Sequence, residues 1–299
     1  MPEAKAPANP PFQVIGLLCK KNSETALETL TQIARVLIEH GYQVLADSSG
    51  PDAEFPPQVK RAGLAEIGEQ AELAIVIGGD GKMLGAARKL SLHNIAVIGV
   101  NRGNLGFLTD LAPDEASEKL LAVLTGNYNI EQRFLLDAKI ELNGEILHRA
   151  NAMNEVVLHS DQVAHMLEFE VDVDGQFVFS QRSDGLIIAT PTGSTAYSLS
   201  AGGPILYPGL NAITLVPMFP HTLSSRPIVV GGDSVIQVRV APDDQPLHIS
   251  CDGHVKLPVP TGAKISITRQ KQALRLIHPT DYNYFHVLRN KLNWGSRLF

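Results

Sequence analysis

The sequence predicts an α/β domain with a parallel sheet, followed by a β-rich domain, and two observations support this fold class. Over residues 12–130, apolar runs of strand length alternate with segments of helical periodicity, which is typical of a parallel sheet flanked by helices. After about residue 130 the apolar residues alternate with period two, which is typical of half-buried antiparallel strands. We therefore expect a change of architecture near that point.

The α/β pattern follows an opening segment, residues 1–11, which is rich in Pro and Ala and predicts a disordered tail rather than a signal peptide. Strands are expected where apolar residues run together, and helices where they recur at helical spacing. In chain order we expect a strand at 12–18, a helix at 23–40, a strand at 42–46, a helix at 58–69, a strand at 73–77, a helix at 82–90 and a strand at 95–100.

The β-rich pattern contains two hairpin signals, Asn143-Gly144 and Asp174-Gly175, each inside an alternating stretch. Further alternation at 235–240, 247–251, 264–268 and 274–277 extends this domain to residue 278. A partly apolar helical pattern over 282–294 then predicts a C-terminal helix. The predicted divisions are a tail at 1–11, an α/β domain at 12–130, a β-rich domain at 131–278 and a C-terminal segment at 279–299.

Composition excludes several classes of protein. Hydrophobic residues make up 44% of the 299 residues and charged residues 19%, which fits a soluble folded protein. A net charge of −6 argues against general nucleic-acid binding, and no apolar run approaches the roughly 20 residues of a membrane span. Cys19 and Cys251 lack the spacing of a disulfide framework or a zinc site. We expect a cytoplasmic enzyme or binding protein that uses neither nucleic acid nor membrane.

The motif Gly78-Gly79-Asp80-Gly81 lies where the predicted strand at 73–77 gives way to a helix. Glycines there allow positive φ and close approach of a ligand, and the N–H groups of a helix start attract phosphate oxygens. An acidic residue in such a cradle would repel phosphate unless it binds a metal ion or accepts a proton. The alternative is a simple turn, because Gly and Asp favour turns for reasons unrelated to ligands.

Two further segments could contact a nucleotide. Asn154-Glu155 offers an amide and a carboxylate at a strand edge, where Glu can accept hydrogen bonds from a ribose diol, although a polar strand end explains the pair as well. Residues 191–204 are rich in Gly, Ser and Thr, and Tyr197 adds an aromatic ring. Their N–H groups and hydroxyls could bind phosphates and purine edges. The alternative is a long solvated loop.

In this order and at these separations, the three motifs resemble those of NAD kinases, with a pattern similar to the enterobacterial type, over nearly the whole chain after the tail. The resemblance implies a Rossmann-like α/β domain, an all-β C-terminal sandwich and a C-terminal helix that packs back on the α/β domain. It also implies phosphorylation of the adenosine 2′-hydroxyl of NAD by ATP to give NADP, a divalent cation such as Mg²⁺ or Mn²⁺, a homotetramer, and NADP(H) as product and candidate inhibitor.

The resemblance also implies roles for individual residues. Asp80 matches the proton acceptor, although binding a metal ion is an alternative role for it. Gly78, Gly79 and Gly81 match the phosphate loop. The residues that match NAD contacts are Asp80, Gly81, Asn154, Glu155, His165, Arg182, Asp184, Thr195, Ala196, Tyr197, Ser198, Leu199, Ser200 and His254.

Two other functional classes stay open at this point. The glycine motif alone is shared with diacylglycerol, sphingosine and 6-phosphofructo-kinases, so a lipid kinase is one alternative. A non-catalytic sensor that binds NADP is the other.

Overall fold

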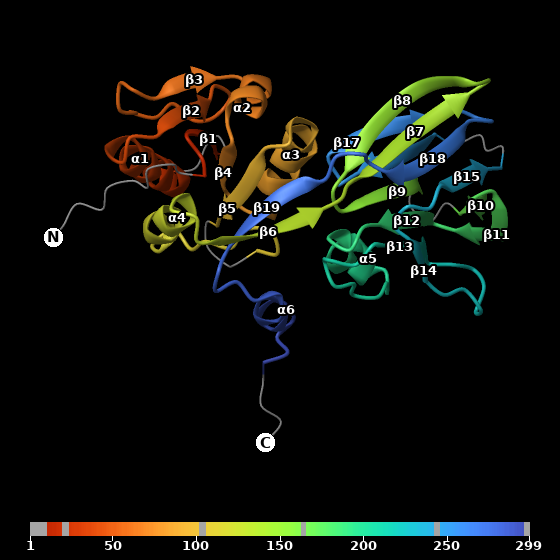
Figure 1. The fold of residues 1–299 in the computed structure, drawn as a ribbon. Helices are drawn as coiled ribbons and strands as arrows, with labels where there is room; N and C mark the ends of the chain where they lie inside the picture. The colour runs from red at the N-terminus through yellow and green to blue at the C-terminus, as the bar shows by residue number, and fades with distance from the viewer. Residues whose placement is uncertain (1–10, 20–23, 102–105, 163–165, 242–245, 296–299) are drawn as a thin grey trace. The chain divides into compact units, whose positions relative to one another are not determined.

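A computed structural model describes residues 11–19, 24–101, 106–162, 166–241 and 246–295. The chain divides into two compact units, residues Met1–Gln132 with Leu274–Phe299 and residues Arg133–Ala273 (Figure 1). Each unit has its own hydrophobic core and its own sheets.

The first unit is an α/β domain. Its elements, in chain order, are β1 (Val14–Cys19), α1 (Glu24–Glu39), β2 (Gln43–Asp47), β3 (Lys60–Ala62), α2 (Leu64–Gln70), β4 (Leu73–Ile77), α3 (Asp80–Leu90), η1 (Ser91–His93), β5 (Ala96–Val100), α4 (Ala116–Leu124), β6 (Tyr128–Arg133), β19 (Leu274–Pro279) and α6 (Tyr284–Leu292). The strands of this unit form one sheet in the order β3-β2-β1-β4-β5-β19-β6. Strand pairs β2–β3, β1–β2, β1–β4, β4–β5 and β5–β19 are parallel.

The core of this unit explains why its central strands are apolar without alternation. Every residue of β4 and β5 is buried, as expected for parallel strands that are covered on both faces. Leu30, Ile33 and Leu37 of α1 share one core with Ile75 of β4 and Ile98 of β5. Within the described residues, no helix is both long and apolar enough to cross a lipid bilayer.

Two elements of the first unit differ from the sequence prediction. The helix expected at 58–69 is a short strand, β3, followed by a shorter helix, α2. The strand expected at 274–277 is β19, which pairs with β5 of the first sheet, whereas the prediction placed it in the β-rich domain. In the sequence, Leu274 and Leu276 alternate with other residues as in a half-buried strand. In the structure, Ile277 and His278 are buried as well, because β19 lies between β5 and β6.

A buried histidine fixes β19 in place. His278 Nε2 lies 3.1 Å from Glu131 Oε2 of β6, and His278 Nδ1 contacts the Asp110 carboxylate. The ring of Tyr282 stacks on the imidazole with centroids 3.9 Å apart. Burial alone would lower the pKa of His278, but the hydrogen bonds to Asp110 and Glu131 outweigh it and raise the pKa. The imidazole is thus held between two carboxylates.

The second unit is a sandwich of two six-stranded sheets. Their strand orders are β11-β10-β15-β18-β7-β8 and β14-β13-β12-β9-β16-β17, and neighbouring strands in both sheets are antiparallel. The elements are β7 (Leu136–Leu142), β8 (Glu145–Ala152), β9 (Glu155–Ser160), β10 (Leu167–Val173), β11 (Gln176–Ser183), β12 (Gly185–Ala189), η2 (Gly193–Thr195), α5 (Tyr197–Ser200), β13 (Ala212–Met218), β14 (Ile228–Gly231), β15 (Ile236–Val240), β16 (Leu247–Cys251), β17 (Val255–Val259) and β18 (Lys264–Arg269).

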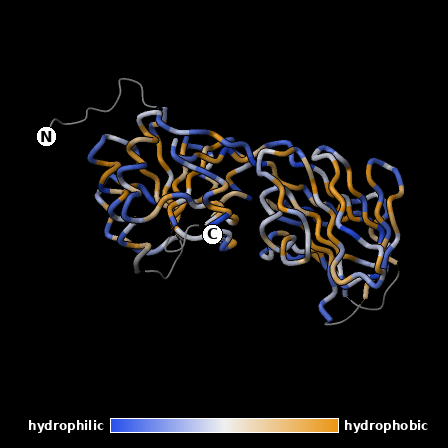
Figure 2. The backbone as a smooth tube through the Cα atoms, turned by 90° about the horizontal axis from the view of Figure 1, so that it is seen from below, coloured by the Kyte–Doolittle hydropathy of each residue, from blue (hydrophilic) through white to orange (hydrophobic). Residues whose placement is uncertain are grey.

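Turn chemistry and alternation build this sandwich as expected. Both residues of the predicted hairpins Asn143-Gly144 and Asp174-Gly175 have positive φ, so these two predictions are confirmed. Inward-facing residues of both sheets, such as Phe169 of β10 and Leu158 of β9, share one core. Figure 2 shows hydrophobic residues along the strands and hydrophilic residues at many of the turns.

In the sandwich, the sheet that contains β9, β12 and β13 has a face that points away from the sandwich core and positions part of the site. Val157 of β9, Ile187 of β12, and Val216 and Met218 of β13 form a small apolar cluster on this face, apart from the sandwich core. Helix α5 contacts β12 at the same sheet, and Ala201 packs against the cluster. We call this surface the outer face.

Candidate active site

The glycine motif forms a strand, a tight turn and a helix start in the first unit, as the sequence predicts. Strand β4 ends at Ile77, and α3 begins at Asp80 with Gly79 as its N-cap. Gly78 has a φ of +155°, and a Cβ there would lie 3.1 Å from Lys82 Cβ. Cβ atoms on Gly79 and Gly81 would meet nothing within 4 Å, so these two glycines leave open space around the turn.

Backbone groups hold the Asp80 carboxylate. Its Oδ2 accepts the N–H of Phe107 at 3.0 Å, while its Oδ1 accepts the N–H of Leu108 at 3.1 Å and the Thr109 hydroxyl at 3.4 Å. A Cβ on Gly106 would lie 2.1 Å from Asp80 Oδ1, so this close approach requires glycine. Within the described residues, Oδ2 accepts one hydrogen bond. Because a carboxylate oxygen has two lone pairs, one acceptor position is left for a ligand.

Lys82 brings a cation to the same edge of the sheet. Its Nζ lies 3.8 Å from Oδ2 of Asp47, the last residue of β2. Asp47 is only 4% exposed. Ser49 donates its N–H to Asp47 Oδ1 at 3.0 Å and its hydroxyl at 2.8 Å. Since β2 and β4 are parallel strands of one sheet, their carboxyl ends share an edge, which is where ligands bind in such sheets.

In the second unit, Glu155 is a buried carboxyl group at the start of β9. The residue is 6% exposed, and its Oε2 has no hydrogen-bond partner among the described residues. Burial raises the pKa of Glu155 to about 8, the nearby Asp252 adds to the rise, and the N–H of Tyr197 opposes it. Glu155 therefore keeps its proton at neutral pH in the unliganded protein and can donate a hydrogen bond.

Asp252 organises the backbone around Glu155. Its carboxylate accepts the N–H groups of Met153 at 2.9 Å, Asn154 at 2.7 Å and Glu155 at 3.2 Å. It sits with Gly253 in the turn between β16 and β17, where both residues have positive φ. The sequence analysis did not select Asp252, although an Asp-Gly pair between two alternating strands is a hairpin signal.

Replacing Asp252 by Ala is expected to lower the thermal unfolding midpoint, because three backbone donors lose their carboxylate. An unpaired buried donor costs roughly 1–3 kcal/mol. The matched control is Asp174→Ala, at another Asp-Gly hairpin, where the carboxylate accepts one exposed N–H, that of Val235. Equal midpoints for the two variants in a calorimetric scan would contradict this role for Asp252.

Glu155 and Asp252 line a pocket of about 560 Å³ on the outer face. Three of the residues selected from the sequence meet here, namely Glu155, Asp184 and Tyr197. None of the described residues that line it is Lys or Arg, so the pocket suits a neutral or cationic group better than a phosphate. The lining residues are Glu155, Val157, His159, Ser160, Asp161, Gln162, Asp184, Tyr197, Met218, Phe219, Ser250, Asp252 and Gly253.

The segment rich in Gly, Ser and Thr is folded tightly rather than being a solvated loop. Thr190 donates its N–H to the Asn154 carbonyl at 2.9 Å and its hydroxyl to the Met153 carbonyl at 2.6 Å. A Cβ on Gly193 would lie 2.1 Å from the Asn154 carbonyl oxygen, so the two backbones touch there. Ser198 is fully buried, and its Oγ has no hydrogen-bond partner in the part of the chain that the structure describes. This packing joins the predicted motifs at Asn154 and at 191–204.

Comparison with known proteins bears on what these sites do. Residues 15–128 match the ATP-NAD kinase N-terminal domain, and residues 153–279 match the ATP-NAD kinase C-terminal domain. The chain is 56% identical to the NAD kinase of Aeromonas salmonicida over 291 residues, which cover 97% of this chain and 99% of that protein. It is 57% identical to the NAD kinase of Photobacterium profundum over 289 residues, which cover 96% of this chain and 99% of that protein.

The chain belongs to the NAD kinase family. The prediction of an NAD kinase, and with it of a phosphotransferase that acts on an alcohol, is therefore confirmed. Neither the lipid kinase nor the non-catalytic sensor gains support from these comparisons.

Solved NAD kinase structures share the fold. A yeast NADH kinase solved in complex with NADH has a TM-score of 0.86 and 23% identity, over 98% of this chain and 91% of that chain. An Archaeoglobus fulgidus NAD kinase solved in complex with ATP has a TM-score of 0.74 and 22% identity, over 95% of this chain and 100% of that chain. The predicted class, an α/β domain with a β-sandwich and a C-terminal helix, is confirmed.

Several residues selected in this NAD kinase do not line the pocket. Arg182 is an exposed residue of β11, which belongs to the other sheet of the sandwich. His254 is also exposed, and its Nδ1 lies 2.6 Å from the carbonyl of Asp252. His165 lies outside the described residues. The remaining selected residues of the second unit that are absent from the pocket lining are Asn154, Thr195, Ala196, Ser198, Leu199 and Ser200.

Proposed function

We propose that this NAD kinase uses Asp80 as the proton acceptor when it phosphorylates the adenosine 2′-hydroxyl of NAD. The 2′-oxygen attacks the γ-phosphorus of ATP, the bond from that phosphorus to the ADP oxygen breaks, and the hydroxyl proton passes to Asp80. NADP and ADP are the products. A general base positioned on a weak nucleophile contributes roughly 100- to 10,000-fold.

The observation that carries the proposal is the geometry of the Asp80 carboxylate. Three donors from residues 107–109 fix its orientation, and Oδ2 keeps one acceptor position for a hydroxyl. A base that is already oriented needs no reorganisation when the proton moves. The open space at Gly79 and Gly81 lets phosphate oxygens approach the start of α3. We therefore assign Gly78, Gly79 and Gly81 to the phosphate side.

The pocket on the outer face is proposed to hold part of NAD. Its carboxyl groups and its lack of described Lys and Arg residues suit a base and a ribose rather than the diphosphate. Glu155 can donate its proton to a ribose oxygen. The other proposed NAD contacts follow from the family resemblance, and they are Gly81, Asn154, His165, Arg182, Asp184, Thr195, Ala196, Tyr197, Ser198, Leu199, Ser200 and His254.

A divalent cation, Mg²⁺ or Mn²⁺, is proposed as cofactor. Within the described residues, no group of three or more His, Cys, Asp or Glu side chains could hold a metal ion. This fits Mg²⁺, which kinases usually hold through one or two carboxylates together with substrate phosphates. In the alternative role of Asp80, its one acceptor position would hold the cation instead of the hydroxyl. When bound, the cation neutralises charge on the transferred phosphoryl group.

The test incubates the purified protein with NAD, ATP and Mg²⁺ and detects NADP with an NADP-specific dehydrogenase. NADP should form, a chelator should stop its formation, and added Mg²⁺ or Mn²⁺ should restore it. Undiminished turnover in excess chelator would contradict the metal requirement alone. No NADP with any metal, together with phosphorylation of diacylglycerol, would reject the proposed function.

Three further properties are proposed from the resemblance. NADP(H) should inhibit, since it keeps the two bases, the diphosphate and the ribose hydroxyls of NAD apart from the 2′-hydroxyl that is phosphorylated. A homotetramer is proposed, in line with the apolar side chains of Phe219, 77% exposed, and Leu223, 98% exposed. A cytoplasmic location agrees with the two buried cysteines, Cys19 and Cys251, which form no disulfide within the described residues. Product-inhibition kinetics, light scattering and cell fractionation would test these three in turn.

A further inference from the structure

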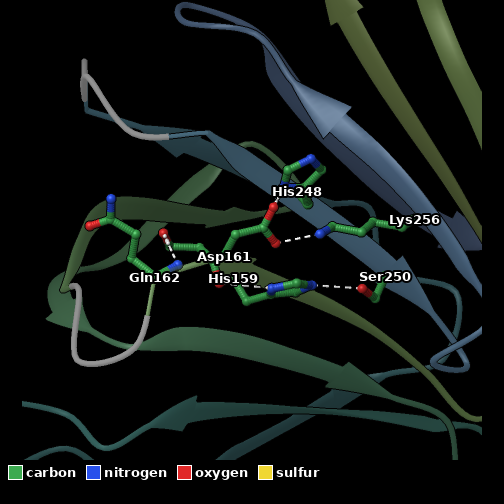
Figure 3. A network of polar contacts seen from close by, with 7 residues as sticks. His159, Asp161, Gln162, His248, Ser250 and Lys256 are labelled. Carbon is green, nitrogen blue, oxygen red and sulfur yellow. Dashed lines mark hydrogen bonds and ion pairs between the residues drawn. The ribbon is translucent and has the colours of Figure 1, made fainter.

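A serine–histidine pair, formed by His159 and Ser250, lies in the same pocket as Glu155. His159 Nε2 of β9 is 2.6 Å from Ser250 Oγ of β16, and His159 Nδ1 is 3.1 Å from the Ser160 carbonyl oxygen (Figure 3). Both side chains line the pocket. Neither residue has a role in the proposed phosphoryl transfer.

The hydrogen bonds of this pair determine whether the Ser250 hydroxyl acts as a donor or an acceptor toward the pocket. A carbonyl oxygen can only accept, so His159 Nδ1 must carry the hydrogen. In the neutral imidazole, Nε2 is then the acceptor, and the Ser250 hydroxyl donates to it. The Ser250 hydroxyl thus donates its only hydrogen to His159 Nε2. It therefore presents only lone pairs to the pocket, as an acceptor of fixed orientation.

The charged groups around the pair do not favour an anion. Figure 3 shows Asp161 between His248 and Lys256. The Asp161 carboxylate contacts the Lys256 ammonium, and its Oδ2 lies 3.4 Å from His248 Nδ1. Burial lowers the pKa of His248, which favours the neutral ring. Since Lys256 already has a carboxylate partner, this end of the pocket offers acceptors to a neutral or cationic donor.

We propose that Ser250, oriented by His159, accepts a hydrogen bond from an exocyclic amino group of the dinucleotide and so contributes to base specificity. This rests on the proposed function. Ser250 pairs with Val157, two residues along β9 from Glu155, which corresponds to about 7 Å along the strand. A ribose at Glu155 and its base at Ser250 can then lie on one face. NAD has two such amino groups, on the nicotinamide carboxamide and on adenine.

The test measures dissociation constants for NAD and two analogues that carry the same charge as NAD. 3-Acetylpyridine adenine dinucleotide replaces the carboxamide amino group by methyl, and nicotinamide hypoxanthine dinucleotide replaces the adenine amino group by oxygen. Wild-type protein should bind one of them about 3- to 10-fold more weakly than NAD. The analogue affected identifies the base. Ser250→Ala should abolish that difference, while Ser180→Ala, at an exposed position of β11, should retain it.

His159 is a positioning residue in this account. His159→Phe should abolish the discrimination as Ser250→Ala does, because the hydroxyl is no longer held away from the pocket. His159→Gln should restore part of it, because its side-chain oxygen can accept the same hydrogen. A merely structural role would not produce this selective rescue.

Two results would overturn the inference. One is equal affinity of wild-type protein for NAD and both analogues. The other is a Ser250→Ala protein that discriminates as wild type does. In either case, continued formation of NADP from NAD would leave the proposed function intact. If the protein neither bound nor phosphorylated NAD, the proposed function would fail and this inference with it.

Discussion

Replacing Asp80 by Asn is expected to lower kcat by roughly 100- to 10,000-fold. The affinity for NAD should fall by less, because the 2′-hydroxyl exchanges a hydrogen bond to a carboxylate for one to a neutral amide oxygen. The amide cannot take up the hydroxyl proton, although it fills the same space beside Gly106. The backbone N–H of Phe107 will then face either an amide oxygen or a like N–H donor, so a modest loss of stability is also expected. The measurements are the initial rate of NADP formation and the equilibrium dissociation constant of NAD.

The control for this variant is Asp52→Asn, which removes an exposed carboxylate of the same unit. It should leave kcat within about a factor of two, since surface changes rarely exceed a few tenths of a kcal/mol. A folded Asp80→Asn protein that binds NAD and turns over at the wild-type rate would show that Asp80 is not the base. Loss of both turnover and Mg²⁺ affinity would instead favour a metal-binding role.

The second large effect concerns Glu155 and the pH dependence of stability. The raised pKa of Glu155, about 8, means that the folded protein keeps a proton that the unfolded chain releases above its ordinary value of 4.5. Between these values the folded state binds more protons, so stability falls as the pH rises. The slope for one such proton is up to about 1.4 kcal/mol per pH unit.

Glu155→Gln should remove this dependence because an amide does not ionise. The wild-type unfolding midpoint should therefore fall relative to that of Glu155→Gln as the pH rises from about 5 to 8, and the difference should level off above that. Glu168→Gln, at an exposed position of β10, is the matched control and should follow wild type. Parallel midpoints for wild type and Glu155→Gln across this range would show that Glu155 ionises normally.

Local patterns in the sequence predicted most of the fold. Apolar runs predicted β4 and β5, because strands that are buried on both faces are continuously apolar. The Asn-Gly and Asp-Gly pairs predicted two hairpins. Strand β3 was missed because a three-residue strand has no periodic signal. The pairing of β19 with β5 is a contact between residues distant in sequence, which local patterning does not encode.

The site was predictable only where a motif is continuous in the chain. Asp80 and Glu155 stand in short polar motifs beside apolar runs, because Asp80 begins the helix after β4 and Glu155 begins β9. Asp252 was missed because it acts through backbone N–H groups almost a hundred residues away in the chain, from Met153 to Glu155. His159 and Ser250 form a pair only because β9 and β16 are neighbours in the sheet.

The central claim, that Asp80 contacts the 2′-hydroxyl of NAD, is tested most directly by a double-substitution cycle. Dissociation constants are measured for NAD and its 2′-deoxyadenosine analogue with wild-type protein and with Asp80→Ala. Removing the hydroxyl should weaken binding to wild type by about 10- to 100-fold, as for a hydrogen bond to a charged group, and should have little effect on Asp80→Ala. An equal loss in both proteins would show that Asp80 and the 2′-hydroxyl do not interact, and would contradict the account.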